Sequence, residues 1–312
     1  MSTLRSAVLL MGPTGSGKSD LAVKLAEELP AEIISVDSAL VYRGMDIGTA
    51  KPSASVRARI PHHLIDIREP SEGYSVGEFA LDVQRALEGV WSRGRLPLLV
   101  GGTMMYFHAL TEGIADLPGA DLEVRAAIDA KAAEAGWQAV HQELAQVDPQ
   151  AAARIHINDP QRIQRALEVH RVTGQTITKL QEARVSVFAD VNVIEFALAP
   201  LERSELHTKI ELRFKAMLEA GFVEEVRRLY ERGDLSPEHP SMRAVGYRQM
   251  WRYLAGQSAL NEATHEAIAA TRQLAKRQLT WLRRRANARW LDSMRPDVAR
   301  EIIDALSESG FA

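Results

Sequence analysis

The stretch Gly12-Pro-Thr-Gly-Ser-Gly-Lys-Ser19 follows the apolar run from Ala7 to Met11 and opens a segment of helical character, from Gly17 to about Glu28. Its spacing matches the phosphate-binding loop G-x-x-x-x-G-K-[ST], and the strand before it and the helix after it supply the context that the motif requires. In such a loop the glycines turn backbone N–H groups toward an oxyanion, the lysine adds charge and the serine hydroxyl ligates Mg²⁺. The sequence therefore predicts a phosphate or pyrophosphate site. The alternative is a glycine-rich turn with a solvated lysine.

Alternating strand and helix signals follow this loop. A capping box, Ser75-Val-Gly-Glu78, begins one of the helices, and three further strands are predicted over Ile33–Val36, Leu64–Ile67 and Leu98–Val100. Such βα alternation indicates an α/β fold with a parallel sheet.

The strand signal disappears from about Leu117 to Ala189, where Ala-, Glu- and Arg-rich helical patterns take over. A strand over Val193–Leu198 resumes the sheet, and the rest of the chain is predicted to be helical. We therefore expect a core domain made of residues 1–117 and 190–312, with C-terminal helices, and an inserted helical domain over residues 118–189.

Composition narrows the functional classes. The chain of 312 residues carries a net charge of -3, yet residues 243–290 hold ten Lys or Arg against two acids, so this segment can bind a polyanion. The absence of cysteine excludes disulfides, thiolate zinc sites and cysteine nucleophiles. No apolar run approaches the ~18 residues of a membrane span, and no leader precedes the first strand, so we expect a cytoplasmic protein.

Two polar residues directly follow predicted strands, where ligands of parallel sheets bind. Asp37 can be a general base or a metal ligand, or it can merely form an Asx turn or a helix cap. Thr103, after Gly101 and Gly102, can donate its hydroxyl to a ligand or cap the helix over residues 104–110. The pair His62-His63 has no third metal ligand at useful spacing and is interpreted as structural or surface-exposed.

Two sets of basic side chains share helical faces. Arg162 and Arg165 are three residues apart, and Arg272, Lys276 and Arg283 form a stripe on another helix. Arrays of this kind bind phosphate backbones, although a charged stripe can also be simply a solvated face.

Taken together, the motifs resemble those of the tRNA dimethylallyltransferase family, also called tRNA isopentenyltransferase, in its bacterial form. The resemblance covers nearly the whole chain and is carried by Gly12-Pro-Thr-Gly-Ser-Gly-Lys-Ser19, Asp37-Ser-Ala-Leu-Val-Tyr42, Gly44-Met-Asp-Ile-Gly-Thr-Ala-Lys-Pro52, Gly101-Gly-Thr-Met104, Asp159-Pro-Gln-Arg162, Arg243-Ala-Val-Gly-Tyr-Arg248 and Lys276-Arg-Gln-Leu-Thr-Trp-Leu-Arg283.

The resemblance implies an enzyme with a P-loop nucleotide-kinase-like core. It would transfer a dimethylallyl group from dimethylallyl diphosphate to the exocyclic amine of the adenine 3′-adjacent to the anticodon, in tRNAs that read codons beginning with U. Asp37 would act as the base, Thr103 would contact the diphosphate or the incoming nucleotide, and Mg²⁺ would be held through Ser19. The implied diphosphate- or nucleotide-binding residues are Gly12, Pro13, Thr14, Gly15, Ser16, Gly17, Lys18 and Ser19.

The resemblance also implies a set of tRNA contacts, because the adenine must swing out of the anticodon loop to reach the isoprenoid. The implied contacts are Asp37, Ser38, Ala39, Leu40, Thr103, Arg125, Gln161, Arg162, Ile163, Gln164, Arg165, Arg243, Ala244, Val245, Gly246, Tyr247, Arg248, Lys276, Arg277, Gln278, Leu279, Thr280, Trp281, Leu282 and Arg283. We expect a monomer. Whether ATP also binds the loop stays open.

Two other functions fit part of the sequence. A P-loop kinase with ATP as donor explains the first 110 residues equally well, but not the basic C-terminal helix. A non-catalytic RNA-binding protein that uses a nucleotide as a switch would give Asp37 and Thr103 no role.

Overall fold

A six-stranded parallel sheet forms the centre of the fold, in the computed structural model that describes residues 5–115 and 117–310. The strand order is β3-β2-β4-β1-β5-β6. All five pairings are parallel, as between Val8 of β1 and Leu98 of β4. The predicted α/β class is confirmed. The strands are β1 (Arg5–Met11), β2 (Ala31–Val36), β3 (His62–His63), β4 (Leu96–Gly101), β5 (Val191–Ala199) and β6 (Arg289–Asp292).

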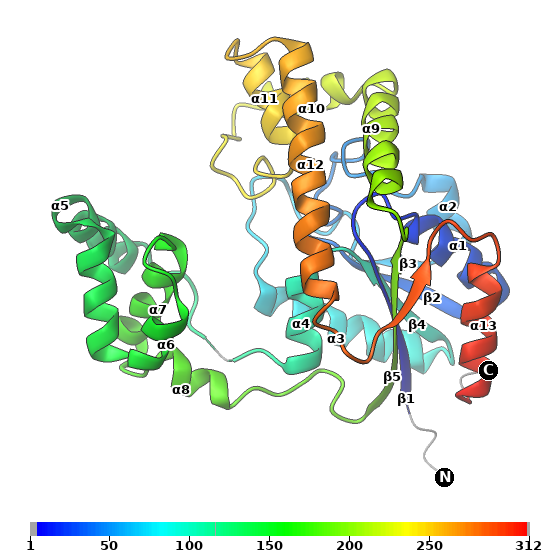
Figure 1. Ribbon diagram of the computed structural model, residues 1–312, viewed down its shortest axis with the longest axis horizontal. Coiled ribbons are helices and arrows are strands. Elements are labelled where there is room, and N and C mark those ends of the chain that lie inside the picture. The colour runs from blue at the N-terminus through cyan, green and yellow to red at the C-terminus, as the bar shows by residue number, and fades with distance from the viewer. Residues whose placement is uncertain (1–4, 116, 311–312) are drawn as a thin grey trace. The chain divides into compact units, whose positions relative to one another are not determined.

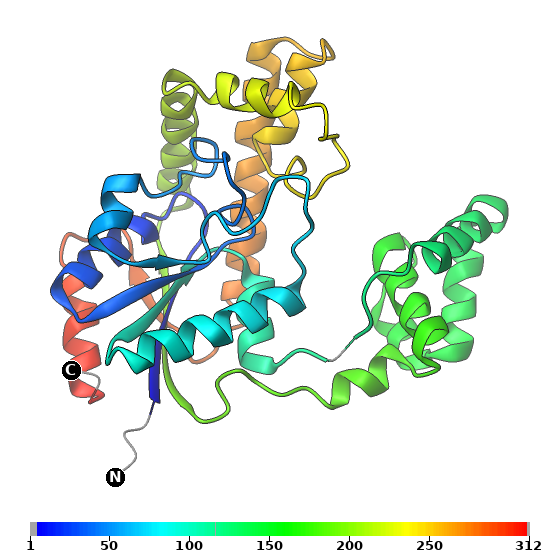
Figure 2. The same ribbon diagram turned by 180° about the vertical axis from the view of Figure 1, so that it is seen from behind.

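Helices cover both faces of this sheet (Figures 1 and 2). On one face, α1 (Lys18–Glu28) and α13 (Val298–Glu308) bury Leu25 and Ile302 in a cluster with Leu10 of β1. On the other face lies α3 (Val76–Ser92), whose buried stripe includes Phe79 and Val83. The predicted capping box begins α3, since Ser75 Oγ accepts from Glu78 N and the Glu78 carboxylate accepts from Ser75 N.

A layer of helices stands above the carboxyl-terminal edge of the sheet, where α9 and α12 lie side by side (Figures 1 and 2). Phe214 of α9 and Phe222 of α10 are buried in its core with Tyr42, which follows β2. An ion pair of 2.9 Å between Arg272 and Glu211 also joins α12 to α9. The helices of this layer are α9 (Arg203–Glu219), α10 (Phe222–Tyr230), α11 (Tyr247–Leu254) and α12 (Leu260–Leu282). Two further helices, α2 (Ala54–Arg59) and α4 (Met104–Glu112), follow β2 and β4 along the chain.

The chain divides into two compact units, one of residues 1–108 and 188–312 and the other of residues 109–187. The second unit is helical and has its own core, in which Ile128, Leu144 and Leu167 are buried. Its helices are α5 (Leu122–Val147), α6 (Pro149–Arg154), α7 (Pro160–Thr173) and α8 (Ile177–Glu182). Residues 118–189 were expected to form the insertion. In the structure the helical unit begins at Ala109, within α4, and ends at Val187.

Two secondary-structure predictions are wrong. The strand expected over Leu64–Ile67 is displaced to His62–His63, because Leu64 and Asp66 have positive φ values of 62° and 56° that no strand accommodates. The carboxylate of Asp66 holds this turn through ion pairs with Lys51 and Arg57. The C-terminal part is also not wholly helical, since β6 pairs with β5 and completes the sheet.

Candidate active site

The phosphate loop begins where β1 ends and closes tightly around its backbone. A Cβ on Gly12 would lie 2.5 Å from the carbonyl oxygen of Leu198, so no larger residue fits there. Gly15 and Gly17 have φ values of 82° and 86°, which L side chains rarely adopt. Helix α1 starts at Lys18, and its N-terminal N–H groups therefore face the loop. This backbone forms an anion-binding concavity.

Lys18 lies against the loop, with Nζ 3.2 Å from the carbonyl oxygen of Pro13. Desolvation lowers the pKa of Lys18, the carboxylate of Asp37 opposes this shift and nearby Arg213 adds to it, so that the pKa is about 8. An anion in the loop would favour the ammonium form. The site is therefore electrostatically suited to a negatively charged ligand.

Asp37 and Thr103 follow the neighbouring strands β2 and β4. The Oδ1 atom of Asp37 accepts a hydrogen bond from Ala39 N at 2.9 Å, which is the Asx turn considered as an alternative role. The turn uses Oδ1 and fixes the orientation of the Asp37 side chain. The hydroxyl of Thr103 accepts from Ser38 N at 3.1 Å and links the two strand ends.

Arg213 is a site residue that the sequence analysis missed. It lies on α9 and donates from Nη2 to Oγ1 of Thr14 at 3.2 Å, which places its charge over the phosphate loop. Desolvation in the cavity lowers the pKa of its guanidinium, and the carboxylates of Asp37 and Asp20 oppose that shift. A signal was available, because Arg213 comes three residues after Ile210 and four before Met217, a spacing that places it on the same side of the helix as these buried residues.

These residues line one cavity of about 570 Å³. One end carries charge from Lys18 and Arg213 and hydroxyls from Thr14, Ser19 and Thr103. An apolar wall continues from it along α9, formed by Ile210, Phe214 and Met217. The cavity thus offers a cationic end and an apolar wall side by side.

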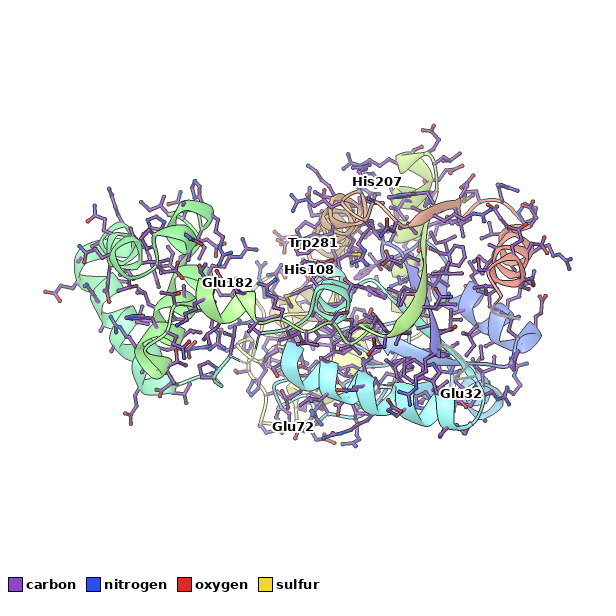
Figure 3. The ribbon with its side chains drawn as sticks, turned by 90° about the horizontal axis from the view of Figure 1, so that it is seen from below. Glu32, Glu72, His108, Glu182, His207 and Trp281 are labelled. Atoms are coloured by element: carbon purple, nitrogen blue, oxygen red, sulfur yellow. The ribbon has the colours of Figure 1, made fainter. Side chains whose placement is uncertain are left out.

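The rim of the cavity adds basic and aromatic side chains. Arg243 and Arg277 line it and are exposed. Trp281 of α12 lines it as well and contacts the ring of His108 edge-on, with 5.7 Å between centroids (Figure 3). Exposed guanidinium and indole groups together are typical of RNA-binding surfaces.

Comparison with known proteins identifies the family of this chain. The family model described as IPP transferase matches residues 40–285. The chain belongs to the IPP transferase family.

Solved structures of the family agree with this assignment. The chain is 38% identical to the tRNA isopentenylpyrophosphate transferase of Bacillus halodurans, with 98% of both chains covered and a TM-score of 0.71. It is 30% identical to the tRNA delta(2)-isopentenylpyrophosphate transferase of Staphylococcus epidermidis, covering 98% of this chain and 99% of that one with a TM-score of 0.69. A eukaryotic dimethylallyltransferase acting on tRNA is 26% identical, with 98% and 79% covered and a TM-score of 0.83.

Three implied tRNA contacts of this IPP transferase have fully buried side chains. They are Ile163, Tyr247 and Leu282. The Tyr247 hydroxyl donates to the buried carboxylate of Glu225, which also accepts from the backbone N–H groups of residues 46–48. Because these three side chains are packed inside the protein, they support the neighbouring residues. The exposed residues of the same segments are the ones that tRNA could reach.

In the helical unit of this IPP transferase, two of the implied contacts are bound to the buried carboxylate of Glu168. Arg125 donates to it from Nε and Nη2 at 2.8 and 3.1 Å, and Arg165 from Nη1 at 2.7 Å. These hydrogen bonds lower the pKa of Glu168 although burial alone would raise it. Gln164 in turn donates to Asp129 at 2.6 Å, whereas Gln161 and Arg162 are exposed at the start of α7.

Within residues 5–115 and 117–310, no three His, Asp or Glu side chains come together as a metal site. His62 bonds to the carbonyl oxygen of Ile60 and His63 bonds to the carboxylate of Glu32, so both histidines have hydrogen-bond partners within the fold.

No helix within residues 5–115 and 117–310 combines the length and the apolar character needed to cross a bilayer.

Proposed function

We propose that the protein transfers the dimethylallyl group of dimethylallyl diphosphate to N6 of the adenine 3′-adjacent to the anticodon in tRNAs that read codons beginning with U, and releases diphosphate. The observation that carries this proposal is the single cavity that combines the phosphate loop, an apolar wall and Asp37. A short apolar group bonded to a diphosphate matches that combination, and a nucleobase is the acceptor that the basic rim suits.

The diphosphate is bound by the loop amides, Lys18 and Arg213. As the bond between C1 of the isoprenoid and the bridging oxygen breaks, its electron pair stays with the diphosphate. Cations and N–H dipoles fixed around that oxygen stabilise the developing charge, which is the dominant contribution in reactions of this type. The wall of Ile210, Phe214 and Met217 shields the allylic carbon from water.

The adenine amine supplies the electron pair of the new C–N bond and must lose a proton. Asp37 supplies a carboxylate to the lining of the cavity, and this carboxylate accepts that proton as the bond forms. Thr103 stands beside it and holds the strand end that carries Ser38. The exposed residues Arg243, Lys276, Arg277 and Arg283 bind the phosphate backbone around the extruded base.

Mg²⁺ is the proposed cofactor. The donor set fits, because the hydroxyl of Ser19 lines the cavity beside the anion site and Mg²⁺ usually binds through one or two protein oxygens together with substrate phosphates and water. When bound, the ion would neutralise charge on the leaving diphosphate. Whether ATP shares the loop is a separate question, since the loop recognises only phosphates.

The enzyme is proposed to act as a monomer in the cytoplasm, on tRNA and without a membrane partner.

The test is a transfer assay. The protein is incubated with unmodified tRNA, Mg²⁺ and dimethylallyl diphosphate, and the digested nucleosides are analysed by mass spectrometry for prenylated adenosine. A matched tRNA in which purine riboside replaces the target adenosine lacks the amine and should remain unmodified. ATP turnover without prenyl transfer would instead support a kinase, and RNA binding without either would support a switch.

A further inference from the structure

Gln278 of α12 connects two loops that meet at the floor of the cavity. Its Oε1 atom accepts a hydrogen bond from Thr14 N at 2.9 Å, and its Nε2 atom donates to the carbonyl oxygen of Gly102 at 2.7 Å. The first partner is a donor and the second an acceptor, so the orientation of the amide is fixed by chemistry. Both ends of the side chain are therefore engaged inside the protein.

The contact with Thr14 determines how the phosphate loop presents its backbone. Thr14 N–H is occupied by Gln278, so an anion in the loop would be bound by the amides beyond it. The Thr14 hydroxyl meanwhile accepts from Arg213. One residue of the loop is thus held by α12 through its backbone and by α9 through its side chain.

The contact with Gly102 is equally close. A Cβ on Gly102 would lie 2.6 Å from Nε2 of Gln278 and 3.2 Å from the carbonyl oxygen of Gly12, so the turn approaches the amide as only glycine permits. The next residue is Thr103, whose hydroxyl bonds to Ser38 N beside Asp37. The hydrogen bonds of Gln278 thus bridge the anion end of the cavity to the turn that supports the proposed base.

Gln278 differs in exposure from the residues of α12 that are proposed to bind RNA. It is half-buried and its amide is bonded to both loops, whereas Arg277 and Trp281 line the rim of the same cavity and are exposed. Lys276, Thr280 and Arg283 are exposed to solvent on the same helix.

We infer that Gln278 is a positioning residue for the diphosphate, which holds the phosphate loop against the turn that carries Thr103, and that its side chain does not contact tRNA. This inference rests on the proposed function. It predicts that the loss of Gln278 weakens diphosphate binding and slows transfer without weakening tRNA binding.

The variants are Gln278→Met, which is close in volume and removes both hydrogen bonds, and Gln278→Glu, which keeps the acceptor for Thr14 N but sets a carboxylate against the Gly102 carbonyl. Gln273→Ala is the matched control, because Gln273 is exposed on the same helix. Affinity for inorganic pyrophosphate with Mg²⁺ is measured by calorimetry, tRNA affinity by filter binding, and KM and kcat by prenyl transfer. Melting temperatures show whether each variant is folded.

Gln278→Met should weaken pyrophosphate binding and raise KM for dimethylallyl diphosphate roughly tenfold, as expected for two lost hydrogen bonds. Gln278→Glu should weaken pyrophosphate binding more than Gln278→Met does, since it adds an anion beside the diphosphate. Affinity for tRNA should stay within about twofold of wild type, the size of an ordinary surface change, and Gln273→Ala should match wild type throughout.

The inference is wrong if folded Gln278→Met binds pyrophosphate as wild type does, or if it loses tRNA affinity as an exposed basic-face variant such as Lys276→Ala does. Failure of the proposed function would look different, because the wild-type protein itself would then make no prenylated adenosine.

Discussion

Arg213 and Thr14 are bonded across 199 residues of sequence, with Nη2 3.2 Å from Oγ1. The same helix therefore supplies a cation to the phosphate loop and, through Ile210 and Phe214, the apolar wall that continues from it. A diphosphate and its hydrocarbon tail would be recognised by neighbouring faces of α9.

Replacing Arg213 tests this arrangement. Arg213→Ala should lower kcat/KM for dimethylallyl diphosphate by roughly 10²–10³, the scale for loss of one preorganised donor to developing negative charge. Arg213→Lys should recover only part of the activity, because an ammonium lacks the planar fork. The measurement is steady-state transfer at saturating tRNA. An Arg213→Ala enzyme with wild-type kinetics would remove Arg213 from the site.

Replacing Asp37 should slow the chemical step and leave the affinity for tRNA unchanged. Asp37→Asn keeps an oxygen for the turn to Ala39 but cannot take up the proton, so single-turnover transfer should fall by ~10²-fold or more. Binding of tRNA, followed by filter retention, should remain unchanged. Equal losses in rate and in tRNA affinity would show instead that Asp37 has only a structural role.

The pKa of Lys18 predicts a pH dependence of diphosphate binding. In the free site this pKa is about 8, and a bound anion raises it, so binding takes up a proton between the two values. Affinity for Mg²⁺–pyrophosphate should thus be highest below pH 8 and fall by up to about tenfold per pH unit above it.

Lys18→Arg is the control for that experiment. A guanidinium remains charged across the range, so the step near pH 8 should vanish, whereas ionisation of pyrophosphate itself affects both proteins alike. Calorimetric titrations from pH 6.5 to 9.5, roughly bracketing the pKa of Lys18, give the ratio of the two affinities. A ratio independent of pH would contradict the assigned role of Lys18.

Much of this site follows from local sequence. The phosphate loop, α1 and the capping box of α3 are predictable because each depends on residues within a few positions of one another. Asp37 and Thr103 are predictable because parallel strands bring their carboxyl ends to one edge.

Other features depend on contacts far apart in sequence. Arg213 and Gln278 reach Thr14 from helices that lie 199 and 264 residues later. The helical spacing of Arg213 indicates its side of α9, but no local pattern specifies Thr14 as the partner of either residue. β6 is short, and only its pairing with β5 makes it a strand. The family resemblance implied a tRNA contact for Gln278 as part of the run from Lys276 to Arg283, and the structure shows that its amide bonds to the two loops.

The network around Glu32 should stabilise the sheet edge. Its buried carboxylate accepts from Arg93 at 2.9 and 2.8 Å and lies 2.7 Å from His63, on β2 beside the end of α3 (Figure 3). The hydrogen bonds from Arg93 lower the pKa of Glu32 to about 2, against the effect of burial. Because Arg93 is half exposed, Glu32→Gln should cost about 1–2 kcal/mol in urea unfolding at neutral pH.

The pH window of this effect follows from the sign of the shift. A lowered carboxyl pKa stabilises the folded state above its ordinary value of 4.5, so the advantage of wild type over Glu32→Gln should shrink as the pH falls from 4.5 toward 2. Glu88→Gln, which breaks the half-exposed pair with Arg5, should cost less than about 0.5 kcal/mol. Equal losses of unfolding free energy for Glu32→Gln and Glu88→Gln would contradict the expected difference between the buried carboxylate and the half-exposed one.

The exposed basic side chains of α12 should act on tRNA through phosphate contacts. Arg283→Ala should weaken tRNA binding and reduce the slope of log affinity against log salt by about 0.7–0.9, with kcat at saturation unchanged. Arg300→Ala on α13 also removes an exposed charge and serves as control. Identical salt slopes for the two variants would place Arg283 outside the RNA interface.

The most direct measurement is a crystal structure of the protein with an unmodified anticodon stem-loop and an unreactive thio analogue of dimethylallyl diphosphate. The account predicts diphosphate oxygens within hydrogen-bond distance of the loop amides, Lys18 and Arg213, the five-carbon tail against Phe214, and the extruded adenine with N6 between C1 and Asp37. An adenine that remains stacked in the RNA, or a diphosphate bound outside the loop of Gly12 to Ser19, would contradict it.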